Sequence, residues 1–162
     1  MDKMAKRGLA LSIFIILGIL ILMRYNNSYI KVEESIEISE TIKKGILDKE
    51  YINIDEIVIE EWDQLLIIGP YTERKEAENE SSIRLNLIKN YNMDINDGAN
   101  LLVFCSDGRV SEYVYLPRYI ADIDLNSFKD NSQTRTVLLP RNQTKFKVVK
   151  ANEILMLKKY SN

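Results

Sequence analysis

The sequence predicts an α+β protein with an N-terminal transmembrane helix, followed by a mainly antiparallel sheet with one or two helices on one face. Three observations lead to this prediction. An uncharged apolar run, Gly8–Met23, lies near the N-terminus. Apolar residues at helical spacing follow in residues 33–48. Strand-like apolar runs joined by short turns then fill most of the second half, and such segregation of helices from strands is typical of α+β folds.

The apolar run is predicted to anchor the chain in a membrane over residues 8–25. A helix across this run spans roughly 24 Å, slightly less than a hydrocarbon core of about 30 Å. Arg7 and Arg24 can extend toward the headgroups and Tyr25 can lie at the interface, which makes up the difference. Two alternatives remain. The first is a cleaved signal peptide, which is disfavoured because no A-x-A-like cleavage site follows Met23. The second is a buried core helix, which is disfavoured by the basic residues on both sides of the run.

The charges around the anchor predict its orientation. Residues 1–7 carry three basic side chains, whereas the chain soon becomes acidic after the anchor. By the positive-inside rule, residues 1–7 form a cytoplasmic stub and the chain crosses the cell membrane once. Residues 26–32 are then a short linker, and residues 33–162 form an extracytoplasmic α+β domain.

The first half of this domain is predicted to hold two helices and a central strand. Residues 33–48 place their apolar side chains on one helical face. A short strand is expected at Ile57–Ile59. Leu65–Ile68 is predicted to be a central strand, because it is continuously apolar and a Gly-Pro pair ends it. A helix is expected from about Glu73 to Lys89, capped by Thr72, although its polar first half indicates that it is short or broken.

The second half is predicted to consist mostly of strands. Leu101–Cys105 and Val110–Leu116 flank an Asp-Gly turn, which is a strong hairpin signal. Residues 120–125 alternate between apolar and polar side chains and indicate another strand. A second hairpin is expected to join residues 145–149 to residues 153–157.

The composition excludes several classes of chemistry. The 162 residues include 22 Lys and Arg, 24 Asp and Glu, one Cys and no His, for a net charge of −2. Without His there is no Ser-His-Asp or Cys-His nucleophilic site and no His-ligated zinc. Cys105 leaves no intrachain disulfide and, at the end of an apolar run, is expected to be buried. The charge near zero argues against nucleic acid as a partner, and nothing in the sequence implies a cofactor or a metal.

The charges are unevenly distributed along the chain. Residues 31–80 are acidic overall and residues 81–162 are basic. The simplest interpretation is that the two halves attract each other within one domain. An alternative is an acidic face with weak affinity for a divalent cation or a basic partner. That face would consist of Asp55, Glu56, Glu60, Glu61 and Asp63.

Four residues at strand ends are the candidates for binding a ligand or partner: Trp62, Asp63, Tyr71 and Arg118. Trp62-Asp63 and Tyr71 bracket Leu65–Ile68, so they mark ends about 20–25 Å apart and do not line one small pocket. Arg118 can approach only one end, meeting Asp63 if its strand is antiparallel to Leu65–Ile68 and Tyr71 if it is parallel. We expect Asp63, because carboxylate–guanidinium pairs and antiparallel strands are the commoner arrangements. The plain alternative places Trp62 in the core and the charged residues at the surface.

The Trp-Asp, Pro-Tyr-Thr and Pro-Arg motifs that contain these four residues resemble motifs of a group of small uncharacterised, single-span extracytoplasmic proteins of Gram-positive-type bacteria. The resemblance covers roughly residues 1–125 and implies location and class, but no activity. Many members look like lipoproteins, and the lack of a lipid-bearing Cys near the anchor is a departure from them. Besides the apolar segment, the matching motifs are Trp62-Asp63, Pro70-Tyr71-Thr72, Phe104, Asp107-Gly108 and Pro117-Arg118.

The sequence therefore predicts a membrane-anchored, extracytoplasmic binding or accessory protein without catalytic activity. Its expected partners are the lipid bilayer, through residues 8–25, and an envelope protein. Two alternatives remain open: a small envelope enzyme that uses carboxylates and Arg118, and an inhibitor-like module that binds a protein. A concave pocket at the candidate residues would favour a ligand, whereas a flat surface with exposed apolar residues would favour a protein partner.

Overall fold

The structure, a computed structural model, describes residues 15–19, 31–128 and 135–160. The chain divides into two compact units, Met1–Lys31 and Val32–Asn162. In the first unit residues 15–19 are helical, and the rest of the predicted membrane anchor lies outside the described residues. Among the helices within the described ranges, none combines the length and the apolar character that a bilayer crossing requires.

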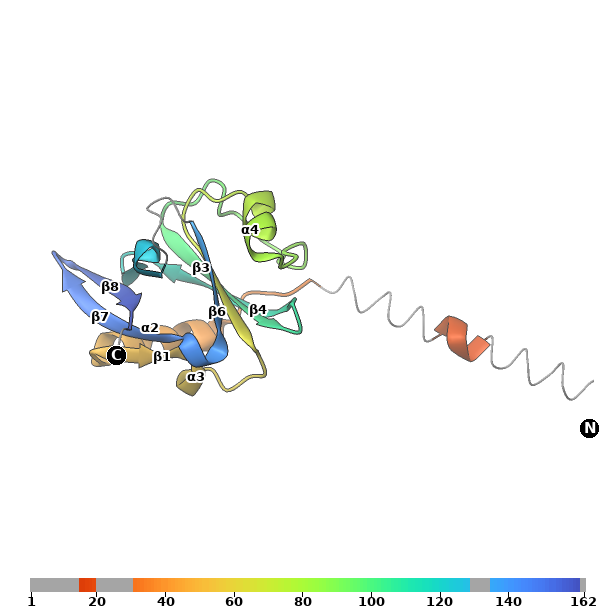
Figure 1. The fold of residues 1–162 in the computed structure, drawn as a ribbon, viewed down its shortest axis with the longest axis horizontal. Coiled ribbons are helices and arrows are strands. Elements are labelled where there is room, and N and C mark those ends of the chain that lie inside the picture. The colour runs from red at the N-terminus through yellow and green to blue at the C-terminus, as the bar shows by residue number, and fades with distance from the viewer. Residues whose placement is uncertain (1–14, 20–30, 129–134, 161–162) are drawn as a thin grey trace, which may run out of the picture. The chain divides into compact units, whose positions relative to one another are not determined.

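The described part of the second unit contains two four-stranded sheets and short helices, which confirms the α+β class (Figure 1). The first sheet has the order β4-β3-β2-β6 and the second has the order β1-β7-β8-β5. The first sheet consists of β2 (Gln64–Ile68), β3 (Ala99–Ser106), β4 (Arg109–Pro117) and β6 (Thr136–Pro140). The second consists of β1 (Tyr51–Asn53), β5 (Ala121–Ile123), β7 (Lys145–Ala151) and β8 (Ile154–Lys159). The helices are α2 (Ile36–Asp48), α3 (Ile54–Ile57) and α4 (Arg74–Ser81), with the 3-10 turns η1 (Leu125–Phe128) and η2 (Arg141–Gln143).

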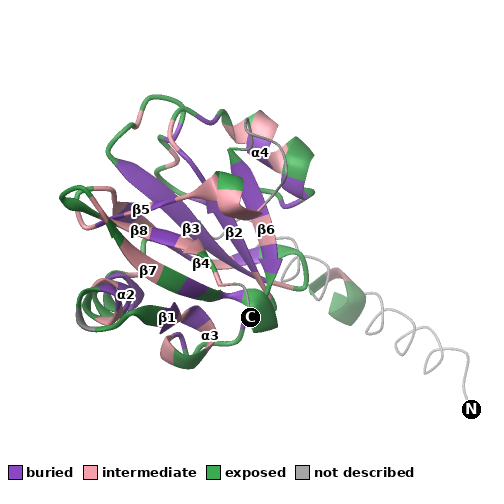
Figure 2. Ribbon diagram, turned by 60° about the vertical axis from the view of Figure 1, so that its left-hand side comes forward, coloured by how far each residue is buried: buried purple, intermediate pink, exposed green. Residues whose placement is uncertain are grey.

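β2 and β3 form the buried centre of the first sheet (Figure 2). β2 pairs antiparallel with β3 on one side and with β6 on the other. Side chains alternate along a strand, so Leu65 and Ile67 enter one apolar cluster while Leu66 and Ile68 enter the other. Because both faces are covered, the strand is apolar throughout, and the predicted central strand is confirmed.

The two longer helices cover opposite faces of this sheet. Ile38, Ile42 and Ile46 of α2 are buried in the cluster that joins the two sheets, and Ser35 caps the helix by accepting a hydrogen bond from the Ile38 N–H. Ala77 of α4 is buried in the cluster on the other face. The prediction that the helices lie on one face is wrong, since a sheet whose central strands are apolar on both sides needs cover on both.

The second sheet contains the predicted C-terminal hairpin. β7 and β8 pair antiparallel across the turn at Ala151–Ile154. A strand was predicted at residues 120–125, and the observed strand there, β5, is shorter. It pairs with β8 in parallel. β1 pairs with the other edge of β7, so the second sheet combines one strand from before the first sheet, one from between β4 and β6, and the C-terminal hairpin.

Two local predictions differ from the structure. The strand expected at Ile57–Ile59 is replaced by α3 and the loop after it. The helix expected to reach Lys89 ends early, at α4, because Ser82 adopts a left-handed conformation with φ of 61°. The buried Ser81 hydroxyl donates to the Ala77 carbonyl at 2.6 Å and accepts from the Ile83 N–H at 3.2 Å. This local bonding favours the end of a helix over its continuation.

Candidate functional site

The strand directions decide which candidate residues meet. β2 and β4 are both antiparallel to β3, which lies between them, so they run in the same direction. Arg118 follows β4 and therefore lies at the Tyr71 end of β2, where its backbone N–H donates to the Gly98 carbonyl at 2.9 Å. The expectation that Arg118 meets Asp63 is wrong, because the intervening strand reverses the direction of the chain. The expectation that Asp63 and Tyr71 lie at separate ends agrees with the register.

Trp62 and Asp63, at the other end of β2, make structural contacts. Trp62 is 5% exposed, its indole N–H donates to the Val58 carbonyl at 3.3 Å, and its ring meets Phe104 edge-on with centroids 5.4 Å apart. The Asp63 carboxylate accepts a hydrogen bond from the Asp107 N–H at 3.1 Å and so stabilises the turn between β3 and β4. These contacts match the plain alternative for this pair.

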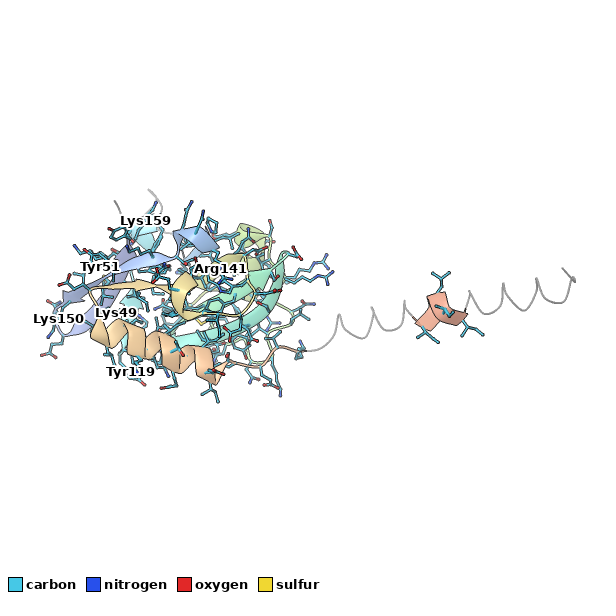
Figure 3. The ribbon with its side chains drawn as sticks, turned by 90° about the horizontal axis from the view of Figure 1, so that it is seen from below. Lys49, Tyr51, Tyr119, Arg141, Lys150 and Lys159 are labelled. Atoms are coloured by element: carbon cyan, nitrogen blue, oxygen red, sulfur yellow. The ribbon has the colours of Figure 1, made fainter. Side chains whose placement is uncertain are left out.

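Arg141, which is labelled in Figure 3 and which the sequence did not single out, links the segments of the chain around Trp62. Its guanidinium lies 4.7 Å from the Trp62 ring centroid and pairs with the Asp55 carboxylate. It also donates to the carbonyls of Glu60 at 3.1 Å and Val58 at 3.3 Å. Asp55, a member of the predicted acidic face, is thus held in an internal ion pair. Because these partners lie some 80 residues earlier in the chain, no local pattern marks Arg141.

Arg118 is held between two segments at the Tyr71 end. Its Nη2 lies 2.6 Å from Oδ2 of Asp122, and its Nη1 donates to the Asp97 carbonyl at 3.1 Å. The hydrogen bond to Asp122 raises the pKa of the Arg118 guanidinium and outweighs the opposing effect of burial. The site therefore contains a permanently charged guanidinium in a fixed orientation.

The partly buried Asp122 and the buried Asn100 form the wall behind Arg118. The Asn100 side chain is 1% exposed, and its Nδ2 donates to Oδ1 of Asp122 at 3.0 Å. Burial alone would raise the pKa of Asp122, but hydrogen bonds from Arg118, Asn100 and the Ile123 N–H together lower it. The carboxylate is therefore ionised at neutral pH. A signal for Asn100 existed in the sequence, because it is a polar residue inside the otherwise apolar run of β3.

A cavity of about 780 Å³ opens over this wall. It lies where the end of β2 and the start of β3 meet β5 and β8 of the second sheet. Two arginines and three carboxylates line it, so the formal charges nearly cancel. The lining residues are Pro70, Glu76, Asn100, Arg118, Asp122, Ile123, Asp124, Leu125, Asn126, Arg135 and Met156. We call this space the Arg118 cavity.

Tyr71 lies next to the Arg118 cavity and is 53% exposed. Its backbone has a φ of 56°, and its carbonyl accepts a hydrogen bond from Nη1 of Arg135 at 2.6 Å. A hydrogen bond to the Asp97 carboxylate raises the pKa of the Tyr71 phenol, and Arg118 acts in the opposite direction. Of the four candidates, the structure thus brings Tyr71 and Arg118 together. The expected role of Thr72 as a helix cap is wrong, because its hydroxyl donates to the Gly69 carbonyl at 2.7 Å instead.

Two further observations bear on the chemistry available. Cys105 is fully buried, and burial raises the pKa of its thiol to about 12, so it is not a nucleophile at neutral pH. Within the described ranges, no three Asp, Glu or Cys side chains gather closely enough to hold a metal ion.

Comparisons of the chain with known protein families, with characterised proteins and with solved structures find no match. The function of the chain is therefore inferred from the chemistry of the Arg118 cavity.

Proposed function

We propose that this chain is a membrane-tethered, outward-facing binding or accessory protein without catalytic activity, and that a small polar ligand occupies the Arg118 cavity. The observation that carries the proposal is the cavity itself. Its volume is in the range of small-molecule sites, and rigid elements hold its polar groups at one end. The apolar run Gly8–Met23 supports the tether, and the positive-inside rule supports the outward orientation.

The state of the polar groups favours binding over catalysis. The lowered pKa of Asp122 keeps it ionised, so it cannot donate a proton at neutral pH. The chain has no His, and its single Cys has a strongly raised pKa. A small enzyme based on Arg118 and carboxylates would need a carboxyl group that exchanges protons near neutral pH.

A protein partner is the second candidate, because exposed tyrosines directly follow two residues that line the Arg118 cavity, Pro70 and Arg118. Tyr71 and Tyr119 are 53% and 81% exposed. Tyr119 is the chain neighbour of Arg118, whose guanidinium contacts the Asp97 carbonyl, and the Tyr71 phenol bonds the Asp97 side chain. Exposed tyrosines beside an arginine are common at protein interfaces. An envelope protein that binds here would make the domain an inhibitor-like or accessory module.

The proposed function is tested by identifying small molecules that remain bound to the purified protein. The full-length chain is purified in detergent and denatured, and the released compounds are analysed by mass spectrometry. Arg118→Ala and Arg135→Ala remove cations from the cavity, and Arg109→Ala, at the exposed first residue of β4, is the matched control. Fluorescence of Trp62, the only Trp, verifies that each variant is folded.

We expect a compound that the wild type and Arg109→Ala retain and that the folded cavity variants lose. Identical sets of compounds from all folded variants would contradict a ligand site in the cavity.

A further inference from the structure

Two buried polar atoms of the Arg118 cavity wall have no partner among the described residues. They are Oδ1 of Asn100 and Nε of Arg118. The first is a hydrogen-bond acceptor and the second is a donor. Leaving such atoms unpaired in a folded protein carries a free-energy cost, so each requires a partner from outside the wall.

The neighbouring contacts fix which atoms remain unpaired. Nδ2 of Asn100 donates to Asp122 at 3.0 Å. Turning the amide over would bring its oxygen against that carboxylate, so Oδ1 stays directed away from Asp122. Both terminal nitrogens of Arg118 are engaged, by Asp122 and by the Asp97 carbonyl. Each of these nitrogens keeps a second N–H, whereas the buried Nε–H makes no hydrogen bond among the described residues and is a donor left for a ligand.

From this pair of atoms we infer the class of ligand: we propose that the Arg118 cavity binds a compound rich in hydroxyl groups, a sugar or a polyol. The inference rests on the proposed function and deepens it. A hydroxyl group donates and accepts at the same oxygen, so the hydroxyl groups of one ligand supply both a donor for Oδ1 of Asn100 and an acceptor for Nε of Arg118. A carboxylate or a phosphate group only accepts and would leave Asn100 unpaired.

The charges of the cavity also favour a neutral ligand. Arg118 is paired with Asp122, and Asp124 lies 3.5 Å from Nζ of Lys158. An anion entering here would face the carboxylates of Asp122 and Asp124 as well as the arginines, because all of them line the cavity, and the carboxylates would repel it. A neutral compound meets these groups as hydrogen-bond partners.

The remaining lining residues suit the apolar faces of a sugar ring. Pro70, Ile123, Leu125 and Met156 contribute apolar surface between the polar groups. Sites for small molecules commonly combine such apolar surface with a few fixed polar groups that set the orientation of the ligand.

The experiment uses NMR of the full-length chain, with the Nε–Hε resonance of Arg118 as the reporter. The protein is held in lauryldimethylamine oxide, a detergent without a sugar headgroup. The probes are maltose, N,N′-diacetylchitobiose and sorbitol, with inorganic phosphate and glycylglycine as an anionic and a zwitterionic comparison. Arg118→Lys assigns the resonance by its loss, while it keeps a cation beside Asp122.

Two binding variants and a control test the two atoms. Arg118→Lys removes Nε, and Asn100→Ala removes Oδ1 while Asp122 keeps its bond from the Ile123 N–H. Asn142→Ala, at an exposed position in η2, is the matched control. The loss of one buried hydrogen bond corresponds to a decrease in affinity of about tenfold or more.

We expect at least one sugar or polyol to shift the Arg118 resonance saturably, with affinity at least tenfold lower in Asn100→Ala and unchanged in Asn142→Ala. If Arg118→Lys fails to fold, Asn100→Ala and the wild-type resonance still decide the question. A shift caused only by phosphate or glycylglycine would overturn the hydroxyl class and leave the proposed site standing. A resonance that no probe moves would also overturn the inference, while the compounds that co-purify would still test the proposed function.

Discussion

At the scale of single residues, Asp122 couples the wall of the Arg118 cavity to pH. Its pKa lies below the ordinary value of 3.8 in the folded protein, so its contribution to stability is present at neutral pH and is lost as the pH falls below about 4. We predict that Asp122→Asn lowers the free energy of unfolding by about 1–2 kcal/mol at pH 7, because a charged hydrogen-bond acceptor is lost. The difference from wild type should vanish toward pH 2.

This prediction is checked by urea unfolding, followed by the fluorescence of Trp62, from pH 7 to pH 2. Asp107→Asn, in the exposed β3–β4 turn, is the matched control. An equal loss of stability at every pH would mean that the charge of Asp122 contributes nothing and that the variant acts through packing alone.

Cys105 gives a second prediction at this scale. Its side chain is fully buried and its Sγ lies 3.8 Å from the Val103 carbonyl. Burial raises the pKa of the thiol to about 12, so a maleimide should label it only after the protein unfolds. Cys105→Ser should lower the free energy of unfolding by about 1–3 kcal/mol, because a hydroxyl replaces an apolar thiol in the core. Rapid labelling of the native protein at pH 8 would contradict both expectations.

Single residues also show what the sequence could and could not predict about the candidate site. Tyr71 and Arg118 were found because each follows a strand that has clear apolar and Pro signals. Their shared location depended on β3 lying between β2 and β4, which no local pattern records. Arg135 follows a segment without a clear pattern, and its bond to the Tyr71 carbonyl joins residues 64 positions apart. Asn100 offered a local signal, a polar residue within a buried strand.

At the scale of elements, the link between Arg141 and the α3 segment explains why a predicted strand is absent. Arg141 binds the carbonyls of Val58, Glu60 and Trp62, so an arginine occupies groups that a neighbouring strand would otherwise bind. The β-branched residues Ile57–Ile59 have a strand preference, and the tertiary contacts override it. β1 and β6 were missed because one has only three residues and the other follows a segment without turn signals. The apolar runs of β2 and β3 and the Asp-Gly turn between β3 and β4 were predicted correctly, since their signal is local.

The Arg141 link gives a prediction at this scale. Arg141→Ala should lower the free energy of unfolding by about 2–3 kcal/mol, because it leaves Asp55 and several carbonyls without their charged donor. Arg141→Lys should restore little of this, because an ammonium cannot reach carbonyls on both sides as the planar guanidinium does. Urea unfolding measures both variants, with Arg109→Lys as the control for an exposed arginine. Full recovery by Lys would show that charge alone is needed.

At the scale of the whole molecule, the predicted anchor at residues 8–25 decides where the Arg118 cavity operates. The run Gly8–Met23 is uncharged, basic residues flank it, and no A-x-A-like site follows it. We predict that the full-length protein fractionates with membranes and resists carbonate extraction, because insertion of an apolar helix does not depend on ionic contacts. A shortened chain that begins at residue 26 should instead appear in the fraction that does not sediment with membranes.

Orientation requires its own measurement. Protease added outside intact cells should remove residues 33–162 and leave the cytoplasmic stub with the anchor, because the basic residues before the run hold it on the inner side. The control is to disrupt the cells before protease treatment. In cells that are left intact, a cytoplasmic protein should survive the protease. A mature protein whose N-terminus begins near residue 26 would instead indicate a cleaved signal peptide. In that case the second unit would still be exported, but it would reach its ligand or partner as a released protein, without the high local concentration that a membrane tether provides.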